Sequence, residues 1–194
     1  ADNMQHLVEQ LLFLARGDAG RAAYSPSVVD LSQLVHAAHE EYEMIGSGHP
    51  FRIRAEEAVL TIGDEAMLKQ ALRILTDNAI KYSPPGAMIT LRAYVSGEGM
   101  SCFSVQDNGP GIKAEDLPQI FERFYRADPA RSRGGTGLGL SIARWIAQRH
   151  EGHIDVVSSE GLGTRFTMNL PAYKGGKNQR EEAPAAAVPV EEKA

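Results

Sequence analysis

The stretch GGTGLGLSIARWIAQRH, residues 134–150, places four glycines directly before a segment with an apolar face at helical spacing. A glycine inside a helix costs about 1 kcal/mol relative to alanine, so this many at a helix start need a reason. Glycines let backbone amides approach an anion, and a helix start adds unpaired N–H groups and a positive dipole end. The pattern therefore favours a phosphate-binding loop that leads into a helix.

Two familiar phosphate-binding templates do not fit this stretch. A Walker A loop needs lysine after its last glycine; Gly134 and Gly139 have the right spacing, but Leu140 follows. In a dinucleotide fingerprint the third glycine would fall on Leu140 or on Ile142. If the loop holds phosphates, it therefore belongs to a third design.

The composition indicates one core and excludes several classes of protein. The chain has 194 residues, 43% of them hydrophobic, and a formal charge of −5, which disfavours a nucleic-acid partner because such binding rests on a basic face. Its single cysteine, Cys102, excludes an internal disulfide framework and fits a reduced cytoplasmic compartment. The most apolar N-terminal run, LVEQLLFLAR, is too short and too interrupted to span a bilayer, and no signal peptide is visible.

The chain divides into four expected segments. Apolar residues from Met4 to Ala15 follow a near-heptad spacing, which predicts an amphipathic helix within residues 1–16 that needs a partner. Residues 17–27 have the composition of a linker, and residues 28–172 have the composition of a folded domain. From Tyr173 the chain is rich in Ala, Pro, Glu and Lys, so we expect a disordered tail over 173–194.

The folded domain is predicted to be an α+β two-layer sandwich, in which a mixed, mostly antiparallel sheet packs on about three helices. Asp64 is the expected N-cap of the central helix. Helices are expected near residues 30–44, 65–82 and from 138 onward, with a short helical stretch through FERFYR (121–126). Strands are expected at residues 51–55, 58–62, 89–95, 100–107, 153–159 and 164–170, with 89–95 and 100–107 forming a hairpin.

The sequence NAIKYS, residues 78–83, ends the central helix. On a 3.6-residue period, Ile74, Asn78, Lys81 and Tyr82 share one stripe, and the apolar Leu68, Leu72, Leu75 and Ala79 fall on the other side. An amide oxygen and an ammonium group one turn apart can serve a metal ion and a phosphate together. By itself the pair is also typical of a solvated helix end.

The sequence DNGPGI, residues 107–112, follows a predicted strand. Asp107 could accept a hydrogen bond from an adenine amine, while Gly109 and Gly111 keep the backbone clear of the ring. The alternative is a plain tight turn, for which Asp-Asn-Gly is suitable.

Together, NAIKYS, DNGPGI, FERFYR and GTGLGLSI resemble, in this order and spacing, the catalytic and ATP-binding domain of sensor histidine kinases. The resemblance covers about residues 28–170. That domain belongs to the ATPase superfamily shared with type II topoisomerases, heat-shock chaperones and mismatch-repair proteins. The resemblance implies ATP and Mg²⁺ as cofactors.

The resemblance also implies roles for individual residues. Asn78 is similar to the Mg²⁺-coordinating asparagine, Lys81 to a phosphate contact, and Arg126 to a γ-phosphate contact; these three are the expected catalytic residues. The implied nucleotide contacts, besides these three, are Tyr82, Asp107, Gly109, Gly111, Ile112, Tyr125, Gly135, Thr136, Gly137, Leu138, Gly139, Leu140 and Thr164. On this interpretation the opening glycines form an ATP lid.

Four further residues near the lid have two interpretations each. Phe121 and Phe124 resemble aromatics that dock the lid region to the helical stem, or they are plain core residues. Arg131 and Arg133 either approach the triphosphate or keep a mobile loop soluble.

The sequence departs from the family pattern at two places. Ile74 stands where the family often has a second asparagine and where hydrolysing relatives place a glutamate, so efficient ATP hydrolysis is not expected. No H-E/D-x-R-T-P motif occurs, and His6 is followed by Leu-Val-Glu, so we do not expect it to accept phosphate. The remaining histidines, His150 among them, are expected to be surface or packing residues.

The resemblance implies a kinase domain that transfers the ATP γ-phosphate to a histidine on a dimerisation hairpin. Residues 1–16 resemble the end of that hairpin's second helix, as in a piece cut from a longer protein. The implied partners are the hairpin of the same protein and a response regulator. The implied full-length protein is a membrane-anchored homodimer with this part in the cytoplasm, and the fragment alone is expected to be monomeric.

Three alternatives remain open at the level of sequence. One is a serine kinase of the anti-sigma-factor type, and another is a non-catalytic nucleotide-sensing module. An ATPase of the topoisomerase or chaperone type is the least favoured, because the water-activating glutamate is missing at Ile74.

Overall fold

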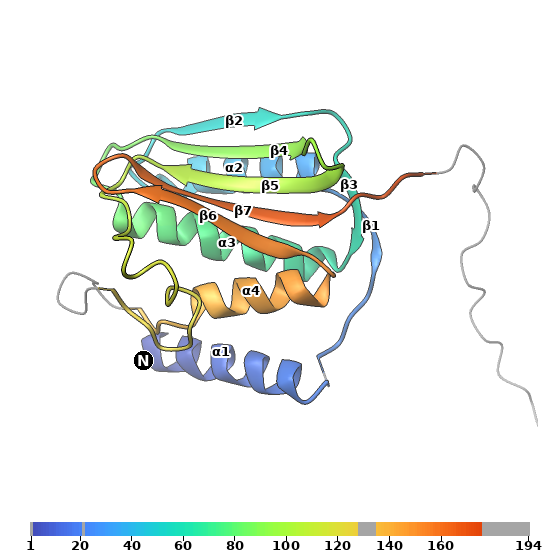
Figure 1. Cartoon of the computed structure of the whole chain (residues 1–194), viewed down its shortest axis with the longest axis horizontal. Helices are drawn as coiled ribbons and strands as arrows, with labels where there is room; N and C mark the ends of the chain where they lie inside the picture. The colour runs from blue at the N-terminus through green and yellow to red at the C-terminus, as the bar shows by residue number, and fades with distance from the viewer. Residues whose placement is uncertain (1, 21, 128–134, 176–194) are drawn as a thin grey trace, which may run out of the picture.

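The protein is an α+β two-layer sandwich, as its sequence predicts (Figure 1). The computed structural model describes residues 2–20, 22–127 and 135–175; Gly134, Arg131, Arg133 and residues 176–194 of the expected tail lie outside them. The helices are α1 (Asp2–Asp18), α2 (Leu31–Ile45), α3 (Glu65–Tyr82) and α4 (Gly139–Arg149). The strands are β1 (Ser27–Asp30), β2 (Phe51–Ala55), β3 (Leu60–Gly63), β4 (Ile89–Val95), β5 (Met100–Asp107), β6 (His153–Ser159) and β7 (Gly163–Pro171).

The main sheet has five strands in the order β2-β4-β5-β7-β6. Strands β2 and β4 pair in parallel and all other neighbours are antiparallel, which confirms the mixed, mostly antiparallel sheet. Helices α2, α3 and α4 cover one face of this sheet, and α1 lies beyond α4 (Figure 1). A second, two-stranded sheet joins β1 and β3 beside them.

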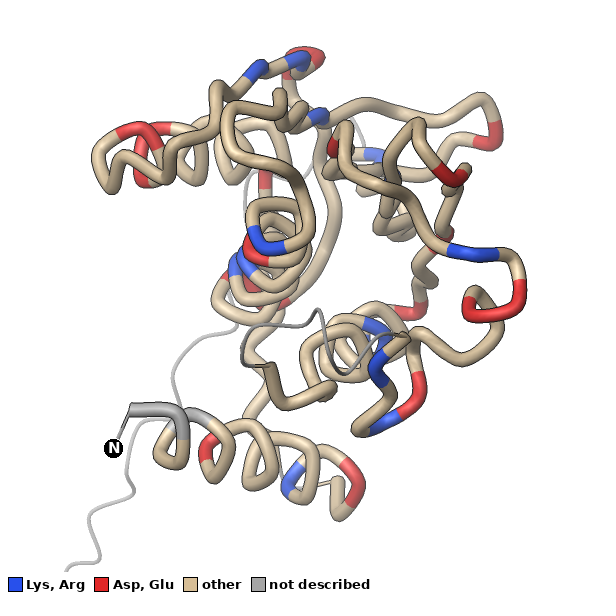
Figure 2. The backbone as a smooth tube through the Cα atoms, turned by 90° about the vertical axis from the view of Figure 1, so that its left-hand side faces the viewer, with Lys and Arg blue, Asp and Glu red and all other residues tan. Residues whose placement is uncertain are grey.

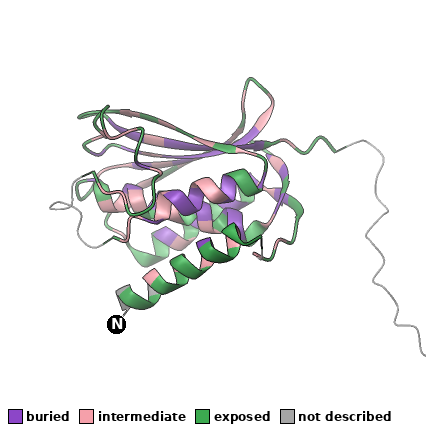
Figure 3. Cartoon of the chain, turned by 60° about the horizontal axis from the view of Figure 1, so that its bottom comes forward, coloured by how far each residue is buried: buried purple, intermediate pink, exposed green. Residues whose placement is uncertain are grey.

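The core fills the space between the sheet and the three helices that cover it (Figure 3). Helix α3 turns its Leu68, Leu72 and Leu75 into this core, where each is at most 1% exposed. Because α3 buries this stripe, its other stripe, which carries Asn78 and Lys81, faces away from the sheet. The core therefore fixes the orientation of the residues expected to bind ligand.

Helix α3 begins and ends where the sequence indicates. The side chain of its N-cap, Asp64, accepts a hydrogen bond from the Met67 N–H at 3.1 Å. At the other end Ser83 adopts extended backbone geometry and precedes two prolines, which cannot continue a helix. Both ends confirm the predicted limits of the helix.

Two elements differ in type from the prediction. Strand β1 lies between the predicted linker, which ends at residue 27, and the predicted helix, which begins near residue 30. The sequence does not predict this strand, because four residues are too few for a recognisable pattern and the strand exists only through its pairing with β3. The expected helical stretch through FERFYR is wrong: residues 114–124 form turns and bends, and Phe124 has a φ of 65°. Pro118 lacks the N–H that a continuous helix would need there.

Helix α1 lies against α4 and extends further than expected, to Asp18. Its Leu14 is 2% exposed, and Phe13 meets the edge of the Trp145 ring with centroids 5.1 Å apart. An ion pair of 2.8 Å joins Asp18 to Arg123. Most of the remaining surface of α1 is exposed (Figure 3), including the apolar Met4, Val8, Leu11 and Leu12.

Basic and acidic positions are interspersed over the backbone (Figure 2), in keeping with the modest net charge of −5. Within the described residues, no helix combines the length and the apolar character required to cross a membrane.

Candidate functional site

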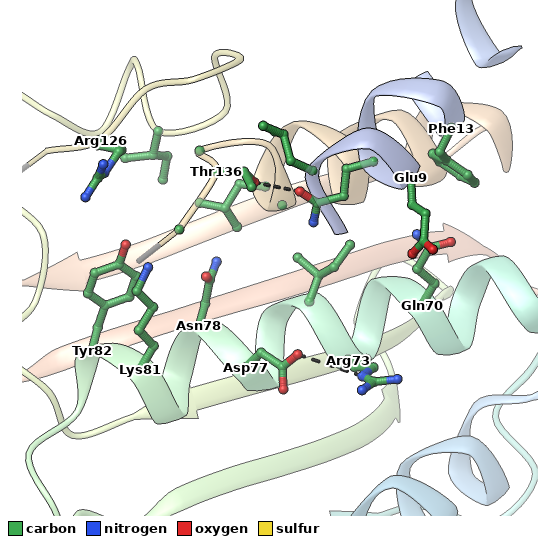
Figure 4. Close-up of a pocket in the computed structure, with 18 of the residues that line it drawn as sticks. Glu9, Phe13, Gln70, Arg73, Asp77, Asn78, Lys81, Tyr82, Arg126 and Thr136 are labelled. Carbon is green, nitrogen blue, oxygen red and sulfur yellow. Dashed lines mark hydrogen bonds and ion pairs between the residues drawn. The ribbon is translucent and has the colours of Figure 1, made fainter. Parts of the chain in front are cut away.

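A cavity of about 1000 Å³ lies between α3, α1 and the glycine segment, by which we mean residues 135–140 (Figure 4). Its size is typical of a pocket for a small molecule or cofactor. The lining from α3 includes Ala66, Lys69, Gln70, Arg73, Ile74, Asp77, Asn78, Lys81 and Tyr82. Opposite them stand Ile120, Arg126, Gly135, Thr136, Gly137, Gly139 and Leu140, and α1 adds Leu7, Glu9, Gln10 and Phe13.

The predicted stripe of α3 reaches into this cavity as a group. Asn78, Lys81 and Tyr82 rise from the helix toward the glycine segment, and Arg126 faces them from the other side (Figure 4). The Lys81 ammonium lies 5.0 Å from the centroid of the Tyr82 ring, a cation–π distance. One end of the cavity thus presents an amide and two cationic side chains, a set suited to a phosphate-bearing ligand with its metal ion.

The glycine segment is fixed to the domain at two points. Leu138 is fully buried in the core, and within the segment its N–H donates to Thr136 Oγ1 at 3.3 Å. Gly137 has a φ of 70° and packs on the backbone of Phe124, whose N–H donates to the Gly137 carbonyl at 2.9 Å. A Cβ atom on Gly137 would lie only 2.7 Å from the Phe124 carbonyl carbon, so only glycine fits there.

A different contact applies at Gly135, where a Cβ atom would collide with the Lys81 ammonium. The absence of a side chain at Gly135 therefore lets Lys81 reach the backbone of the glycine segment. At Gly139 a Cβ would lie 3.2 Å from Ile74 Cγ2, which brings this glycine close to α3.

Asp107 ends β5 as a buried carboxylate, with 7% of the residue exposed. Its Oδ1 accepts hydrogen bonds from the Gly109 N–H at 2.8 Å and the Thr164 N–H at 3.3 Å. Burial raises the pKa of this carboxyl group, and the two backbone hydrogen bonds oppose the rise. Within the described chain Oδ2 has no hydrogen-bond partner, so one acceptor remains for a ligand.

The Asp107 turn adjoins the end of α3 but does not line the cavity. A Cβ on Gly109 would lie 3.2 Å from the Tyr82 carbonyl oxygen, so the turn and the helix end are in direct contact. The cavity therefore unites the helix end and the glycine segment, with the carboxylate turn next to it. The expected nucleotide contacts outside its lining are Asp107, Gly109, Gly111, Ile112, Tyr125, Leu138 and Thr164.

Several of these outlying residues are held by hydrogen bonds. The Ile112 N–H donates to Ser158 Oγ at 2.8 Å, and Ser158 Oγ lies 2.8 Å from Thr164 Oγ1. Gly111, with a φ of 75°, packs against the Ser159 backbone. The Tyr125 hydroxyl donates to Asp116 at 2.6 Å, and this bond raises the pKa of the phenol.

The two phenylalanines of the FERFYR motif behave differently. Phe121 meets the edge of the Phe166 ring at 6.2 Å and lies under the Arg144 guanidinium, as expected for a packing residue. Phe124 is 58% exposed and contributes its backbone rather than its ring to the glycine segment.

Sequence reasoning did not find the contribution of α1 to the cavity. The Thr136 hydroxyl donates to Gln10 Oε1 at 2.6 Å, so α1 and the glycine segment are hydrogen-bonded (Figure 4). The apolar pattern of α1 signalled that it needs a partner, but it did not indicate that the partner is the cavity wall. Such a contact depends on tertiary packing.

The cavity has no carboxylate at the position where a hydrolytic ATPase would hold water, since Ile74 occupies it. The nearest carboxylate on α3 is Asp77, which accepts a 2.6 Å hydrogen bond from the Tyr42 hydroxyl and lies 3.8 Å from Arg73 Nε. Burial and the bond to Asp77 together raise the pKa of Tyr42, which keeps this phenol a donor. Asp77 is thus engaged away from Asn78.

Comparison with known families matches residues 63–174 to the family described as histidine kinase-, DNA gyrase B- and HSP90-like ATPases. The sensor histidine kinase YkoH of Bacillus subtilis is 39% identical over 178 residues, 91% of this chain and 38% of that protein. The phosphate regulon sensor protein PhoR of Pseudomonas aeruginosa is 34% identical over 185 residues, 93% of this chain and 42% of that protein. The chain thus spans about two fifths of the length of these relatives.

Solved structures show the same fold. The mycobacterial sensor histidine kinase MprB superposes with a TM-score of 0.66 at 30% identity, covering 77% of this chain and 98% of that one. Full-length ShkA, solved in complex with AMPPNP, superposes with a TM-score of 0.76 at 28% identity, covering 88% of this chain and 36% of that one.

Proposed function

Because this chain belongs to the histidine kinase-, DNA gyrase B- and HSP90-like ATPase family, we propose that it is the ATP-binding catalytic domain of a two-component sensor histidine kinase. The observation that carries the proposal is the cavity in which Asn78 and Lys81 of α3 face the glycine segment. The sensor histidine kinases among its relatives, and the AMPPNP complex of ShkA, support the same interpretation.

Nucleotide binding in this cavity would use the groups already in place. The Asn78 side-chain oxygen would hold Mg²⁺, while Lys81 and Arg126 would contact phosphate oxygens together with amides of the glycine segment. Asp107 Oδ2 would accept a hydrogen bond from the adenine amine at the adjoining turn. Magnesium supplies charge neutralisation at the phosphates, and the side chains position them, which is most of what phosphoryl transfer requires.

The phosphoryl acceptor would be a histidine on a dimerisation hairpin outside these 194 residues. Its imidazole nitrogen would form the new bond to the γ-phosphorus as the bond to ADP breaks. Ile74 supports this assignment, because that position offers no base to activate water instead. The parent protein would be a membrane-anchored homodimer with this domain in the cytoplasm, and it would pass the phosphoryl group to a response regulator.

The metal role of Asn78 gives the most direct test. Asn78→Ala is expected to weaken ATP binding about tenfold or more in the presence of Mg²⁺, since a lost polar contact in a cavity costs about 1–3 kcal/mol. Without Mg²⁺ the variant and the wild type should bind alike. Calorimetric ATP titration with and without Mg²⁺ measures both.

Gln70→Ala serves as the matched control, because Gln70 lines the same cavity two turns earlier on α3. It should keep the wild-type response to Mg²⁺. Equal losses in the presence and absence of Mg²⁺ for Asn78→Ala would contradict the metal role of this residue.

The identity of the phosphoryl acceptor is tested by adding the hairpin as a separate fragment. The 194-residue chain alone is expected to bind ATP without labelling itself, whereas a dimerisation hairpin of the same protein should acquire acid-labile phosphate when it is added. Radiolabelled ATP with acid and base treatment of the product distinguishes phosphohistidine from acid-stable phosphoserine. Stoichiometric self-labelling of the chain, or an acid-stable product on a partner, would overturn the proposed acceptor.

A further inference from the structure

His150 is a buried residue at the end of α4, only 3% exposed, whose two ring nitrogens both have partners. Nδ1 lies 2.7 Å from the Ile146 carbonyl oxygen, which can only accept, so Nδ1 carries the proton. Nε2 accepts the N–H of Asp64 at 2.9 Å. The ring is therefore neutral, in one defined tautomer.

The partners of His150 belong to four parts of the fold. Asp64 is the N-cap of α3, and a Cβ on Gly63 at the end of β3 would lie 2.5 Å from the His150 ring. The segment between α1 and β1, of which residues 19, 20 and 22–26 are described, is called the connecting segment below. The rings of its Tyr24 and of His150 meet edge to face, with centroids 5.3 Å apart. His150 thus lies where the connecting segment, β3, α3 and α4 meet.

The connecting segment is held by groups adjacent to His150. The Ser25 N–H donates to Asp64 Oδ2 at 2.9 Å, and the Arg149 guanidinium stacks on the Tyr24 ring at 4.2 Å. Asp64 therefore links the two sides, since its carboxylate binds Ser25 and its own N–H binds His150.

We propose that neutral His150 is a positioning residue that locks the connecting segment to the first turn of α3, so that acidification releases this segment while the sheet stays folded. Helix α1, which forms one wall of the cavity, is connected to the domain through the same segment. Release would remove one of the attachments of α1 to the domain and so loosen its position relative to the stripe of α3 that carries Asn78, while its packing on α4 remains.

Protonation breaks the lock because it turns Nε2 into a donor that faces the Asp64 N–H donor. Burial lowers the pKa of His150; the Ile146 carbonyl and the Asp64 carboxylate favour the charged form, and Arg149 opposes it. The released ring has a pKa of about 6.5. The locked state therefore has its full stability above about pH 6.5 and loses it as the pH falls from there toward the lowered pKa of the locked ring.

Amide hydrogen exchange followed by NMR on the full 194-residue chain, without nucleotide, tests the lock. Between pH 7.5 and 5.5 the protection factors of the Ser25 and Asp64 amides are expected to fall by up to about tenfold. This is the largest change that protonation of the released ring, with a pKa of about 6.5, can produce over that range. The amide of Phe103, buried in the centre of the sheet, should keep its protection. The ring signals of His150 should begin to titrate only toward the acid end of this range, because burial lowers the pKa of the locked ring.

Two variants separate the lock from general stability. His150→Gln keeps a neutral donor and acceptor, so its Ser25 and Asp64 protection should no longer depend on pH. His36→Gln, which removes an exposed histidine of α2, should behave as the wild type. Constant protection in the wild type, parallel loss at Phe103, or an unchanged acid response in His150→Gln would each overturn the proposal.

The effect on ATP rests on the proposed function and has its own measurement. ATP affinity at pH 7.5 and 5.5 should change more in the wild type than in His150→Gln. A chain that binds no ATP at either pH would contradict the nucleotide site, while the exchange result would still decide the role of His150.

Discussion

Asp107→Asn is expected to weaken ATP binding by about tenfold or more and to leave the fold intact, because a lost buried polar contact costs about 1–3 kcal/mol. The substitution preserves the shape of the side chain. An asparagine carbonyl can still accept from the Gly109 and Thr164 amides, as Oδ1 does now. In asparagine, however, an NH2 group takes the place of Oδ2. This group and the adenine amine are both donors, so the hydrogen bond between them is lost.

The same substitution should change the stability of the nucleotide-free protein in the opposite direction. Burial raises the pKa of Asp107, so folding favours the neutral form of this carboxyl group. The penalty for the charged form therefore develops as the pH rises from the ordinary pKa of an aspartate to the raised pKa, is complete above it, and is removed by the neutral asparagine. Thermal unfolding at pH 7 should show a melting temperature at or above that of the wild type.

Glu160→Gln is the control for the loss of one negative charge, since Glu160 is an exposed residue of the β6–β7 turn. It should bind ATP as the wild type does. If Asp107→Asn bound ATP with wild-type affinity, the adenine-reading role of Asp107 would be refuted.

The parts of the fold that the sequence predicted are those set by local patterns. Helix α3 has a capping aspartate, an apolar stripe and a Ser-Pro-Pro stop, and all three act within the segment itself. Strands β4 and β5 likewise match their predicted limits, because alternation and a glycine-containing turn define a hairpin locally. Strand β1 escaped prediction because only its pairing with β3 makes it a strand.

The candidate site divides along the same line. Asn78, Lys81 and the glycine segment were predicted as a group, since their motifs indicate both the side chains and the backbone that face a ligand. The wall formed by α1 and the lock at His150 depend on contacts between segments far apart in the chain. Thr136 is 126 residues from Gln10, and His150 is 86 residues from Asp64. No short motif records such contacts.

The turns before the glycine segment illustrate how a local pattern can mislead. The apolar spacing of Phe121 and Phe124 is compatible with a helix, but Phe124 adopts a positive φ and gives its N–H to Gly137. The backbone of Phe124 is needed as a support for the glycine segment, and this tertiary role outweighs the helical pattern.

Gly137→Ala is expected to weaken ATP binding about tenfold or more, because the added methyl group displaces the glycine segment. The cost of this steric contact comes in addition to the roughly 1–2 kcal/mol that a left-handed backbone costs an alanine. Its Cβ would lie 2.7 Å from the carbonyl carbon and 2.8 Å from the Cα of Phe124, both backbone atoms that cannot rotate away. The 2.9 Å hydrogen bond between Phe124 and Gly137 would be lost or lengthened as the segment shifts.

Gly99→Ala isolates the conformational part of this effect. Gly99 has a φ of 77° in the β4–β5 turn, and no atom lies within 4 Å of its added Cβ. It should therefore lose about 1 kcal/mol of stability and no ATP affinity, since only the left-handed φ is penalised. Calorimetric ATP titration and thermal unfolding of the two variants separate the effect of the contact with Phe124 from the cost of the left-handed φ. Equal melting temperatures and equal ATP affinities for both would show that the contact with Phe124 does not position the glycine segment.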